Sequence, residues 1–319
     1  MFALETRNLS RRFGKVTAVN DLNLQVAQGS LFGLIGPNGA GKTTTLRMLA
    51  GLLQPSSGEI RLNGDHQFLA QNSSWDEQKR MIGYMPDFFG VYEDLLVWEY
   101  LDFFARCYRL PAARRRQVVD ELLELVDLAE KRDAQVQTLS RGMRQRLCLA
   151  HALVHDPQIL LLDEPASGLD PRARVEMREL LRELSSMGKT ILLSSHILSE
   201  LAELCDSIGI IERGKLVVNG PLDSIRTQIR EEHHLSIKAI DSLDRVEELL
   251  QNQPGVYNII RVNQVLNGEM LEFELSGGDE AVADVLDYLV NNKIRVISYH
   301  EVHNDLEDIF MSLTKGETA

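Results

Sequence analysis

The sequence predicts an α/β protein built on a parallel sheet and followed by a smaller α+β domain. Short apolar runs alternate with helical patterns up to about residue 225, and the run 159–162 is apolar throughout, as in a strand covered on both faces. After residue 230 the order becomes strand, helix, strand, strand, helix, strand, which is the ferredoxin-like arrangement. The 319-residue length suits two domains, which we place at residues 1–225 and 226–319.

In the first domain, apolar and β-branched runs alternate with stretches of helical periodicity. The alternating pattern within residues 2–62 adds an antiparallel flap beside the parallel sheet, and a helical subdomain is expected at about residues 88–155. Strands are predicted over 2–7, 22–26, 30–35, 159–162, 190–194 and 207–212; helices are predicted over 43–51, 98–109, 114–128, 142–155, 171–187 and 199–205.

The second domain carries no residue cluster that points to chemistry. Its strands are predicted over 235–239, 257–263, 270–276 and 296–300, and its helices over 243–252, 280–291 and, as a short last element, 305–313. His233 with His234, and His300 with His303, have spacings that a metal could use, but no further ligand joins them. We therefore interpret this domain as an interaction or regulatory module.

Charge and composition exclude several classes of protein. The net charge is −13, and residues 226–319 hold 8 Lys and Arg against 18 Asp and Glu. Such a surface is repelled by nucleic acid and by anionic lipid. Apolar runs stay well below the ~18 residues of a membrane span, and we see no signal peptide. We expect a cytoplasmic protein without direct lipid insertion, in which the three scattered cysteines are reduced thiols.

A phosphate-binding loop follows the predicted strand 30–35 and opens the next helix. Its residues are Gly36, Pro37, Asn38, Gly39, Ala40, Gly41, Lys42 and Thr43, which match the pattern GxxxxGK[ST], with Thr44 next in the chain. The glycines let backbone N–H groups surround phosphate oxygens, and the helix directs its positive end at the same anion. Lys42 is expected to reach the β and γ phosphates, and the Thr43 hydroxyl to bind Mg²⁺.

Two acids end the buried strand 159–162. Ligands bind at the carboxyl ends of strands in open α/β sheets, so Asp163 is the expected holder of Mg²⁺. Glu164, one residue on, can accept a proton from an attacking water. Together with the phosphate loop, the pair predicts a site for ATP and Mg²⁺.

The order of further motifs resembles the nucleotide-binding subunit of ABC transporters. Residues 139–146 (Leu-Ser-Arg-Gly-Met-Arg-Gln-Arg) are similar to the signature motif, 167–170 to the D-loop, and His196 to the switch histidine. Phe13 stands where the family places an aromatic that stacks on adenine. The resemblance covers roughly residues 2–222 and implies the ABC type of P-loop NTPase fold.

The resemblance also implies a mechanism. Two such domains, a homodimer or a pair of related ATPase subunits, enclose ATP between the phosphate loop of one and the signature of the other. Ser140 and Gly142 would then contact the γ-phosphate of ATP bound to the partner chain. His196 would bind the γ-phosphate in its own chain, Glu164 would polarise the water, and Lys42 would complete the catalytic set.

Two positions depart from the family pattern. Asp87 stands at the glutamine of the Q-loop; a carboxylate is a good ligand for Mg²⁺, but its charge lies near the triphosphate. Arg141 replaces the first signature glycine, either as a cation that helps the γ-phosphate or as a solvated surface residue. We expect hydrolysis to be retained but slow.

Within the family, residues 88–95 and 305–310 resemble ATPases of the ABC-2 class, which serve a separate integral membrane permease. The aromatic stretch 84–92 is then the expected groove for a helix of that permease. The resulting prediction is an ATP-hydrolysing motor subunit held at the cytoplasmic face of a membrane. The alternative is a soluble or weakly hydrolytic ABC-type regulatory nucleotide-binding module.

Overall fold

The computed structural model describes residues 1–63, 66–67, 80–87, 90, 92, 94–222, 224, 232–264 and 268–302. The chain forms two compact units, Met1–Pro221 and Leu222–Ala319. The division falls four residues before the predicted one. Each unit is described by itself below.

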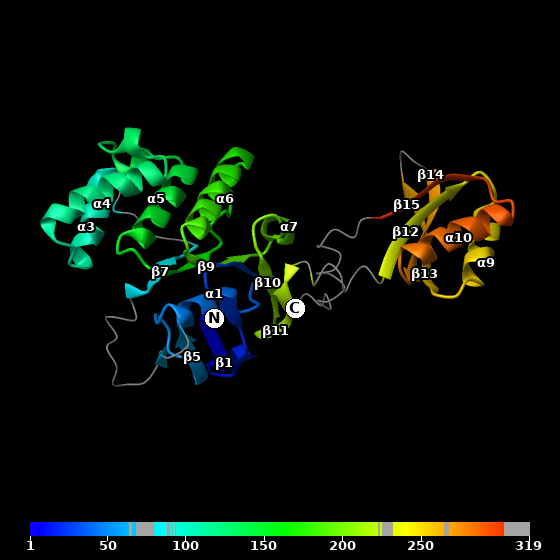
Figure 1. Cartoon of the computed structure of the whole chain (residues 1–319), viewed down its shortest axis with the longest axis horizontal. Helices are drawn as coiled ribbons and strands as arrows, with labels where there is room; N and C mark the ends of the chain where they lie inside the picture. Colours follow the sequence, from blue (N-terminus) through cyan, green and yellow to red (C-terminus); the bar gives the residue numbers. More distant parts are fainter. Residues whose placement is uncertain are drawn as a thin grey trace. The chain divides into compact units, whose positions relative to one another are not determined.

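A six-stranded sheet forms the centre of the first unit (Figure 1). Its strands follow the order β11-β10-β4-β9-β8-β7; β10, β4, β9, β8 and β7 run parallel, and β11 adds an antiparallel edge. Their bounds are β4 (Leu31–Ile35), β7 (Ile82–Met85), β8 (Ile159–Asp163), β9 (Thr190–Ser195), β10 (Ser207–Glu212) and β11 (Lys215–Pro221). All residues of β4, β8 and β9 are buried, as the continuous apolar runs predicted.

The predicted antiparallel flap is present and shares its core with the parallel sheet. Its strands are β1 (Phe2–Phe13), β2 (Val16–Leu22), β3 (Gln25–Ala27), β5 (Ser57–Leu62) and β6 (His66–Gln67). Leu4 and Leu62 of the flap belong to one buried apolar cluster with Leu34 and Leu161 of the parallel sheet. This shared core fixes the flap beside the start of the phosphate loop.

Helices cover the sheet and form a separate helical group. α1 (Lys42–Leu49) contacts β8, while α6 (Pro171–Ser186) and α7 (Leu198–Ala202) contact β9. α3 (Val97–Cys107), α4 (Ala112–Leu125) and α5 (Arg141–Leu153) pack on one another, and α5 also contacts β7. α5 therefore connects the helical group to the sheet (Figure 1).

The second unit confirms the predicted ferredoxin-like topology. Its elements are β12 (Glu232–Ala239), α9 (Leu243–Gln251), β13 (Val256–Gln264), β14 (Gly268–Ser276), α10 (Asp279–Asn291) and β15 (Val296–Glu301). The strands pair antiparallel in the order β13-β14-β12-β15. Leu235, Phe273, Val246 and Leu289 form a core between the sheet and both helices.

Some element predictions were wrong or incomplete. The predicted strand 22–26 is divided, because Asp21 adopts φ 51° and the Asn23 side-chain amide donates to its carbonyl, so the chain turns between β2 and β3. β7 and β11 were not predicted as strands; β7 has four residues, and β11 is an edge strand with one exposed face. The predicted helix 305–313 lies outside the described residues. Among the described residues, we find no helix with the length and apolarity needed to cross a membrane.

Candidate functional site

The phosphate loop connects β4 to α1, as its sequence predicted. Gly39 and Gly41 adopt φ of 81° and 109°, values that residues other than glycine rarely adopt. Gly41 is also the N-cap of α1. A Cβ on Gly36 would overlap the backbone carbonyl of Ile211 in β10. The glycines are thus required both for the turn and for the close approach of the loop to the sheet.

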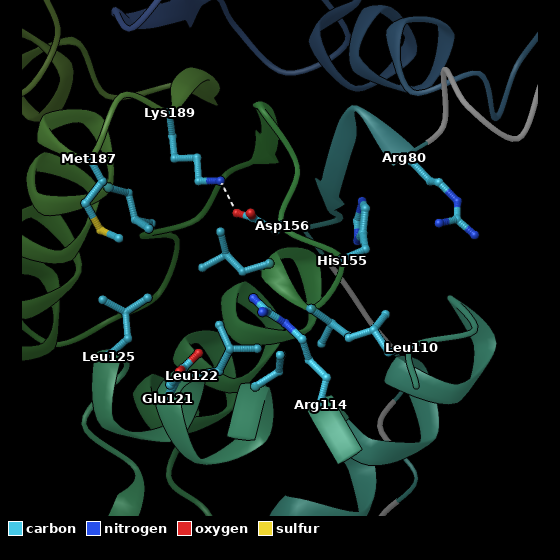
Figure 2. A pocket seen from close by; sticks show the side chains of 14 residues that line it. Arg80, Leu110, Arg114, Glu121, Leu122, Leu125, His155, Asp156, Met187 and Lys189 are labelled. Atoms are coloured by element: carbon cyan, nitrogen blue, oxygen red, sulfur yellow. Dashed lines mark hydrogen bonds and ion pairs between the residues drawn. The ribbon is translucent and has the colours of Figure 1, made fainter. Parts of the chain in front are cut away.

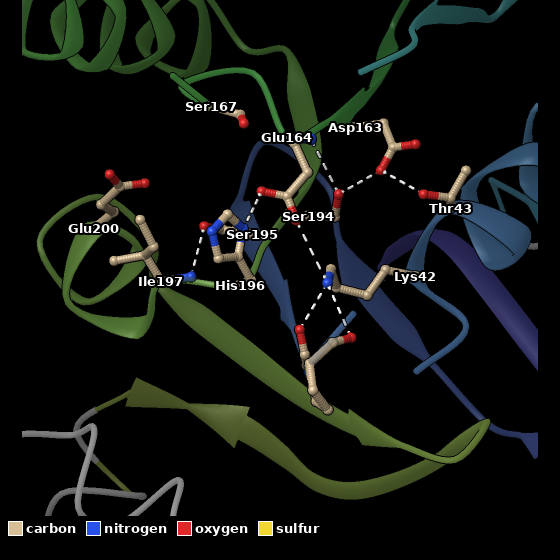
Figure 3. Close-up of polar contacts among 12 residues, drawn as sticks. Lys42, Thr43, Asp163, Glu164, Ser167, Ser194, Ser195, His196, Ile197 and Glu200 are labelled. Atoms are coloured by element: carbon tan, nitrogen blue, oxygen red, sulfur yellow. Dashed lines mark hydrogen bonds and ion pairs between the residues drawn. The ribbon is translucent and has the colours of Figure 1, made fainter. Parts of the chain in front are cut away.

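Lys42 lies inside this loop. Its side chain is 6% exposed, and Nζ donates to the carbonyl oxygens of Gly36 (2.6 Å) and Pro37 (3.3 Å). The same ammonium lies 3.4 Å from Oε1 of Glu164. The cation is therefore held where the loop and the acidic end of β8 meet (Figure 3).

Hydrogen bonds between two hydroxyls and one carboxylate join α1, β8 and β9 next to the loop. Oδ1 of Asp163 accepts from Oγ1 of Thr43 in α1 (3.1 Å) and from Oγ of Ser194 in β9 (2.7 Å). Ser194 is fully buried and Asp163 nearly so. Because β8 and β9 are neighbours in register, with Asp163 opposite Ser194, the sheet itself brings these groups together.

Glu164 follows with a left-handed backbone and three polar partners. Its φ is 50°, a conformation that non-glycine residues adopt mainly under constraint and that occurs often at functional sites. Its N–H donates to Oγ of Ser194 (3.1 Å), and Oε2 accepts from Nδ1 of His196 (2.8 Å). With Lys42 at its other oxygen, the carboxylate is fixed in one orientation (Figure 3).

Lys42, Thr43, Glu164 and His196 line one cleft of about 340 Å³. Its lining is the phosphate loop from Pro37 to Thr44 with Ala18, Asp87, Glu164, Ser167 and His196. Burial, followed by the charges of Asp163 and Glu164, raises the pKa of Asp87 above its usual value. The cleft thus gathers most of the predicted phosphate loop, all three predicted catalytic residues (Lys42, Glu164 and His196) and two of the three predicted metal ligands (Thr43 and Asp87).

The signature residues line a second cleft of about 470 Å³. Ser140 is the N-cap of α5 and accepts from the N–H of Met143 (3.3 Å), and Gly142 approaches α6 so closely that a Cβ would lie 3.0 Å from that of Ala173. Arg141 is exposed, and its Nη2 donates to the carbonyl of Ser167 (3.0 Å). The two clefts have no lining residue in common among those described.

The remaining sequence candidates lie elsewhere. Phe13, at the end of β1, is 46% exposed, and the guanidinium of Arg11 lies 4.5 Å above its ring. In the aromatic stretch 84–92, Tyr84 packs against the core, whereas Tyr92 is exposed and contacts Phe103 edge-on. Phe88 and Phe89 lie outside the described residues.

A further cleft, of about 590 Å³, lies away from this chemistry. It is lined by leucines of α4 with Arg80, Arg114, His155, Asp156 and Lys189, most of which precede strands rather than follow them (Figure 2). Lys189 and Asp156 form an ion pair there.

In the second unit, His233 is buried and forms a hydrogen bond with Glu301 (2.7 Å). Within the described part of the chain, no group of His, Cys, Asp and Glu residues is arranged to hold a metal ion.

Sequence reasoning missed Ser194 and the contact that Ser167 makes. Ser194 is a polar residue near the end of an otherwise apolar buried strand, which is a usable signal because buried hydroxyls need partners. Ser167 was placed in the D-loop, but its carbonyl as a partner of Arg141 was not foreseen, because 26 residues separate the two.

The parallel sheet, the phosphate loop and the acidic end of β8 define a P-loop ATPase. The family model for the ABC transporter matches residues 19–167, and the model for the C-terminal domain of DrrA1-3-like ATP-binding proteins matches residues 220–314. The chain belongs to the ABC transporter family, as one of its ATP-binding, ATP-hydrolysing subunits.

Individual relatives extend this result over both units. The Nod factor export ATP-binding protein I of Cupriavidus metallidurans is 43% identical over 98% of this chain and 98% of its own. The bacitracin transport ATP-binding protein BcrA of Bacillus licheniformis is 36% identical over 99% and 98%. A solved ATP-binding subunit of an ABC transporter is 32% identical with a TM-score of 0.63, covering 71% of this chain and 93% of that one.

Proposed function

We propose that the chain is the ATPase subunit of an ABC-2 type exporter, which dimerises on ATP and drives a separate permease from the cytoplasmic face of the membrane. The observation that carries this proposal is the meeting of Lys42, Glu164 and His196 in the phosphate-loop cleft. Hydrolysis of a phosphoanhydride requires a cation that binds the phosphates and a base that is oriented toward the attacking water. Lys42 supplies the cation, and Glu164, oriented by His196, supplies the base.

The residues at the carboxyl end of β8 fit Mg²⁺. The hydroxyl of Thr43 and the carboxylate of Asp163 lie 3.1 Å apart, and a few protein oxygens together with nucleotide phosphates are the usual ligands of this ion. Asp87, which lines the same cleft as Thr43, adds a third oxygen donor. When bound, Mg²⁺ supplies positive charge that offsets the charge of the phosphates.

Glu164 acts as the base in this proposal. His196 and Lys42 each hold one of its oxygens, and Ser194 holds its backbone N–H, so the carboxylate is oriented before a substrate arrives. Such preorganisation lowers the cost of placing a water for attack on the γ-phosphate. Lys42 and the N–H groups of the loop bind the phosphates.

The separate position of the signature supports a head-to-tail dimer. Ser140 and Gly142 line their own cleft, so the signature of one chain is available to ATP held by a second ATPase chain. Free N–H groups at the start of α5 favour an anion. A bound γ-phosphate would then join two chains, and hydrolysis would release them.

The relatives support export through a permease. Two relatives that match nearly the full chain are named for Nod factor export and bacitracin transport, which points to a transporter and away from nucleic acid as a partner. A regulatory module that hydrolyses weakly was the alternative. The oriented Glu164–His196 pair favours hydrolysis over that alternative, because mere binding does not need a positioned base.

Phosphate release by the full-length chain with MgATP tests the proposal. Glu164→Gln is expected to reduce release by about 100-fold or more, to retain ATP binding, and to accumulate as a dimer when MgATP saturates. Glu200→Gln is the matched control, because Glu200 pairs with Arg174 outside the phosphate-loop cleft. Undiminished release by Glu164→Gln, or a monomer at saturating MgATP, would overturn the proposal.

A further inference from the structure

Arg141 bonds the D-loop at the point where that segment passes from one cleft to the other. Ser167 lines the phosphate-loop cleft, and the next residue, Gly168, lines the signature cleft. Nη2 of Arg141 donates to the carbonyl of Ser167 (3.0 Å). The guanidinium occupies the space where a side chain on Gly168 would lie, and Gly168 adopts φ 65°.

The bonded segment leads directly to the proposed base. The N–H of Ser167 donates to the carbonyl of Glu164 (3.0 Å), so that one short turn separates the Arg141 contact from Glu164. A continuous path of hydrogen bonds therefore runs from the first residue of α5 through Ser167 to Glu164.

The location of Arg141 has no explanation in helix stability alone. A cation in the first turn of a helix opposes the helix dipole, so the position is unfavourable unless another contact compensates. The Ser167 carbonyl is such a contact. The charge also reaches the phosphate-loop cleft, since Arg141 lowers the pKa of Asp87 against the larger effect of burial.

We propose that Arg141 is a positioning residue that transmits occupancy of the signature to Glu164 of the same chain. The inference rests on the proposed function, in which the signature contacts ATP held by the partner. Each chain then touches two nucleotides, one through its signature and one through its phosphate loop. Arg141 links the two, so that this chain hydrolyses its own ATP efficiently only when its signature is engaged.

The D-loop is the part that Arg141 positions, rather than α5. α5 is a 13-residue helix with a side-chain cap at Ser140 and buried contacts along its length. The segment between Glu164 and Leu169 is a turn in which Pro165 is buried and Gly168 is exposed; the Ser167–Glu164 bond and Arg141 hold its exposed end. Loss of the arginine therefore loosens the turn and not the helix.

Mixed dimers separate this role from a direct contact of Arg141 with the partner's γ-phosphate. A low concentration of active chain is combined with an excess of Glu164→Gln chain and MgATP, so that nearly every active chain has an inactive partner. Arg141→Met, which keeps the length and removes the donors, is placed either on the active chain or on the Glu164→Gln chain. Phosphate release is measured per active chain.

We expect Arg141→Met on the active chain to lower turnover about tenfold, and the same change on the Glu164→Gln chain to leave it within about twofold. If turnover falls only when Arg141→Met is on the Glu164→Gln chain, Arg141 contacts the nucleotide of the partner chain. If turnover falls equally in both arrangements, Arg141 has a general structural role. Either result overturns the inference. Arg141→Lys on the active chain should recover most of the turnover, because an ammonium can still donate to Ser167.

Binding of a fluorescent ATP analogue to the Arg141→Met chain should match that of the unaltered chain, because Arg141 does not line the phosphate-loop cleft. If unaltered homodimers release no phosphate, the proposed function fails as well. If they do release it and the active-chain variant is unimpaired, only the role of Arg141 fails.

Discussion

Nδ1 of His196 lies 2.8 Å from Oε2 of Glu164, although 32 residues separate them in the chain. Both follow neighbouring parallel strands, β8 and β9, whose carboxyl ends lie at one edge of the sheet. The imidazole N–H donates to the carboxylate and fixes its rotation. In the proposed reaction, His196 thus orients the base in addition to any contact with phosphate.

His196→Ala tests this orientation. We expect turnover to fall on the order of 10- to 100-fold, since a misplaced reacting group costs that much, while ATP binding through Lys42 and the loop changes little. Steady-state phosphate release and analogue binding measure the two effects. His300→Ala, an exposed change in the second unit, serves as the control; equal turnover in the two variants would contradict the orienting role.

Ser194→Ala should cost both stability and activity. The buried hydroxyl donates to Asp163 and accepts from the N–H of Glu164, so its removal leaves that N–H unpaired. We expect the free energy of unfolding to fall by about 1–3 kcal/mol and turnover to fall as well. Urea unfolding is the measurement. Ser186→Ala, at an exposed end of α6, should change stability far less, and a similar loss in both would argue against the network.

Site features formed by contiguous residues were predicted from the sequence, whereas contacts between residues far apart in the sequence were not. The turn of the phosphate loop and the helix after it were predicted, because Gly36 to Thr43 are contiguous and their spacing specifies both; phosphate binding by the loop stays a prediction. Ser194 and the Arg141–Ser167 bond were not predicted, since both depend on which strands and helices become neighbours. The same holds for the fold: continuous apolar strands such as β8 were predicted, whereas β7 is short and was missed.

Asp87→Asn should stabilise the protein at neutral pH. Burial and the charges of Asp163 and Glu164 raise the pKa of Asp87, so the folded state favours its protonated form. The stability that protonated Asp87 contributes is fully present at pH values below the unfolded-state pKa. It is lost as the pH rises through the folded-state pKa. The variant should therefore gain stability over the unaltered chain at pH 8, with the gain shrinking on acidification, as followed by urea midpoints. A gain independent of pH would contradict this cause.

Asp87→Gln, which restores the family residue, should raise turnover. The carboxylate lies in the phosphate-loop cleft, and its negative charge opposes the triphosphate. An amide keeps an oxygen donor without that charge. Phosphate release at saturating MgATP measures the effect, and an unchanged rate would show that Asp87 does not limit turnover.

Acid should destabilise the first unit through His151 of α5. Burial, with a smaller effect of His155, lowers the pKa of His151 to about 4, and its ring stacks on Phe104 at 3.6 Å. Because the folded-state pKa lies below the unfolded one, the unfolded chain takes up a proton first, and stability falls between about pH 6.5 and 4. The loss is about 2 kcal/mol at pH 5.

His151→Gln removes that proton uptake while keeping a polar side chain. The variant loses the aromatic stack and starts less stable at pH 7.5, but it should lose less on going to pH 5 than the unaltered chain does. Urea unfolding at both pH values gives the comparison, and His300→Gln should leave the pH dependence as it is. Equal losses of stability in His151→Gln and in the unaltered chain would mean that His151 is already protonated in the folded protein at pH 5. That result would contradict the lowered pKa of the buried ring.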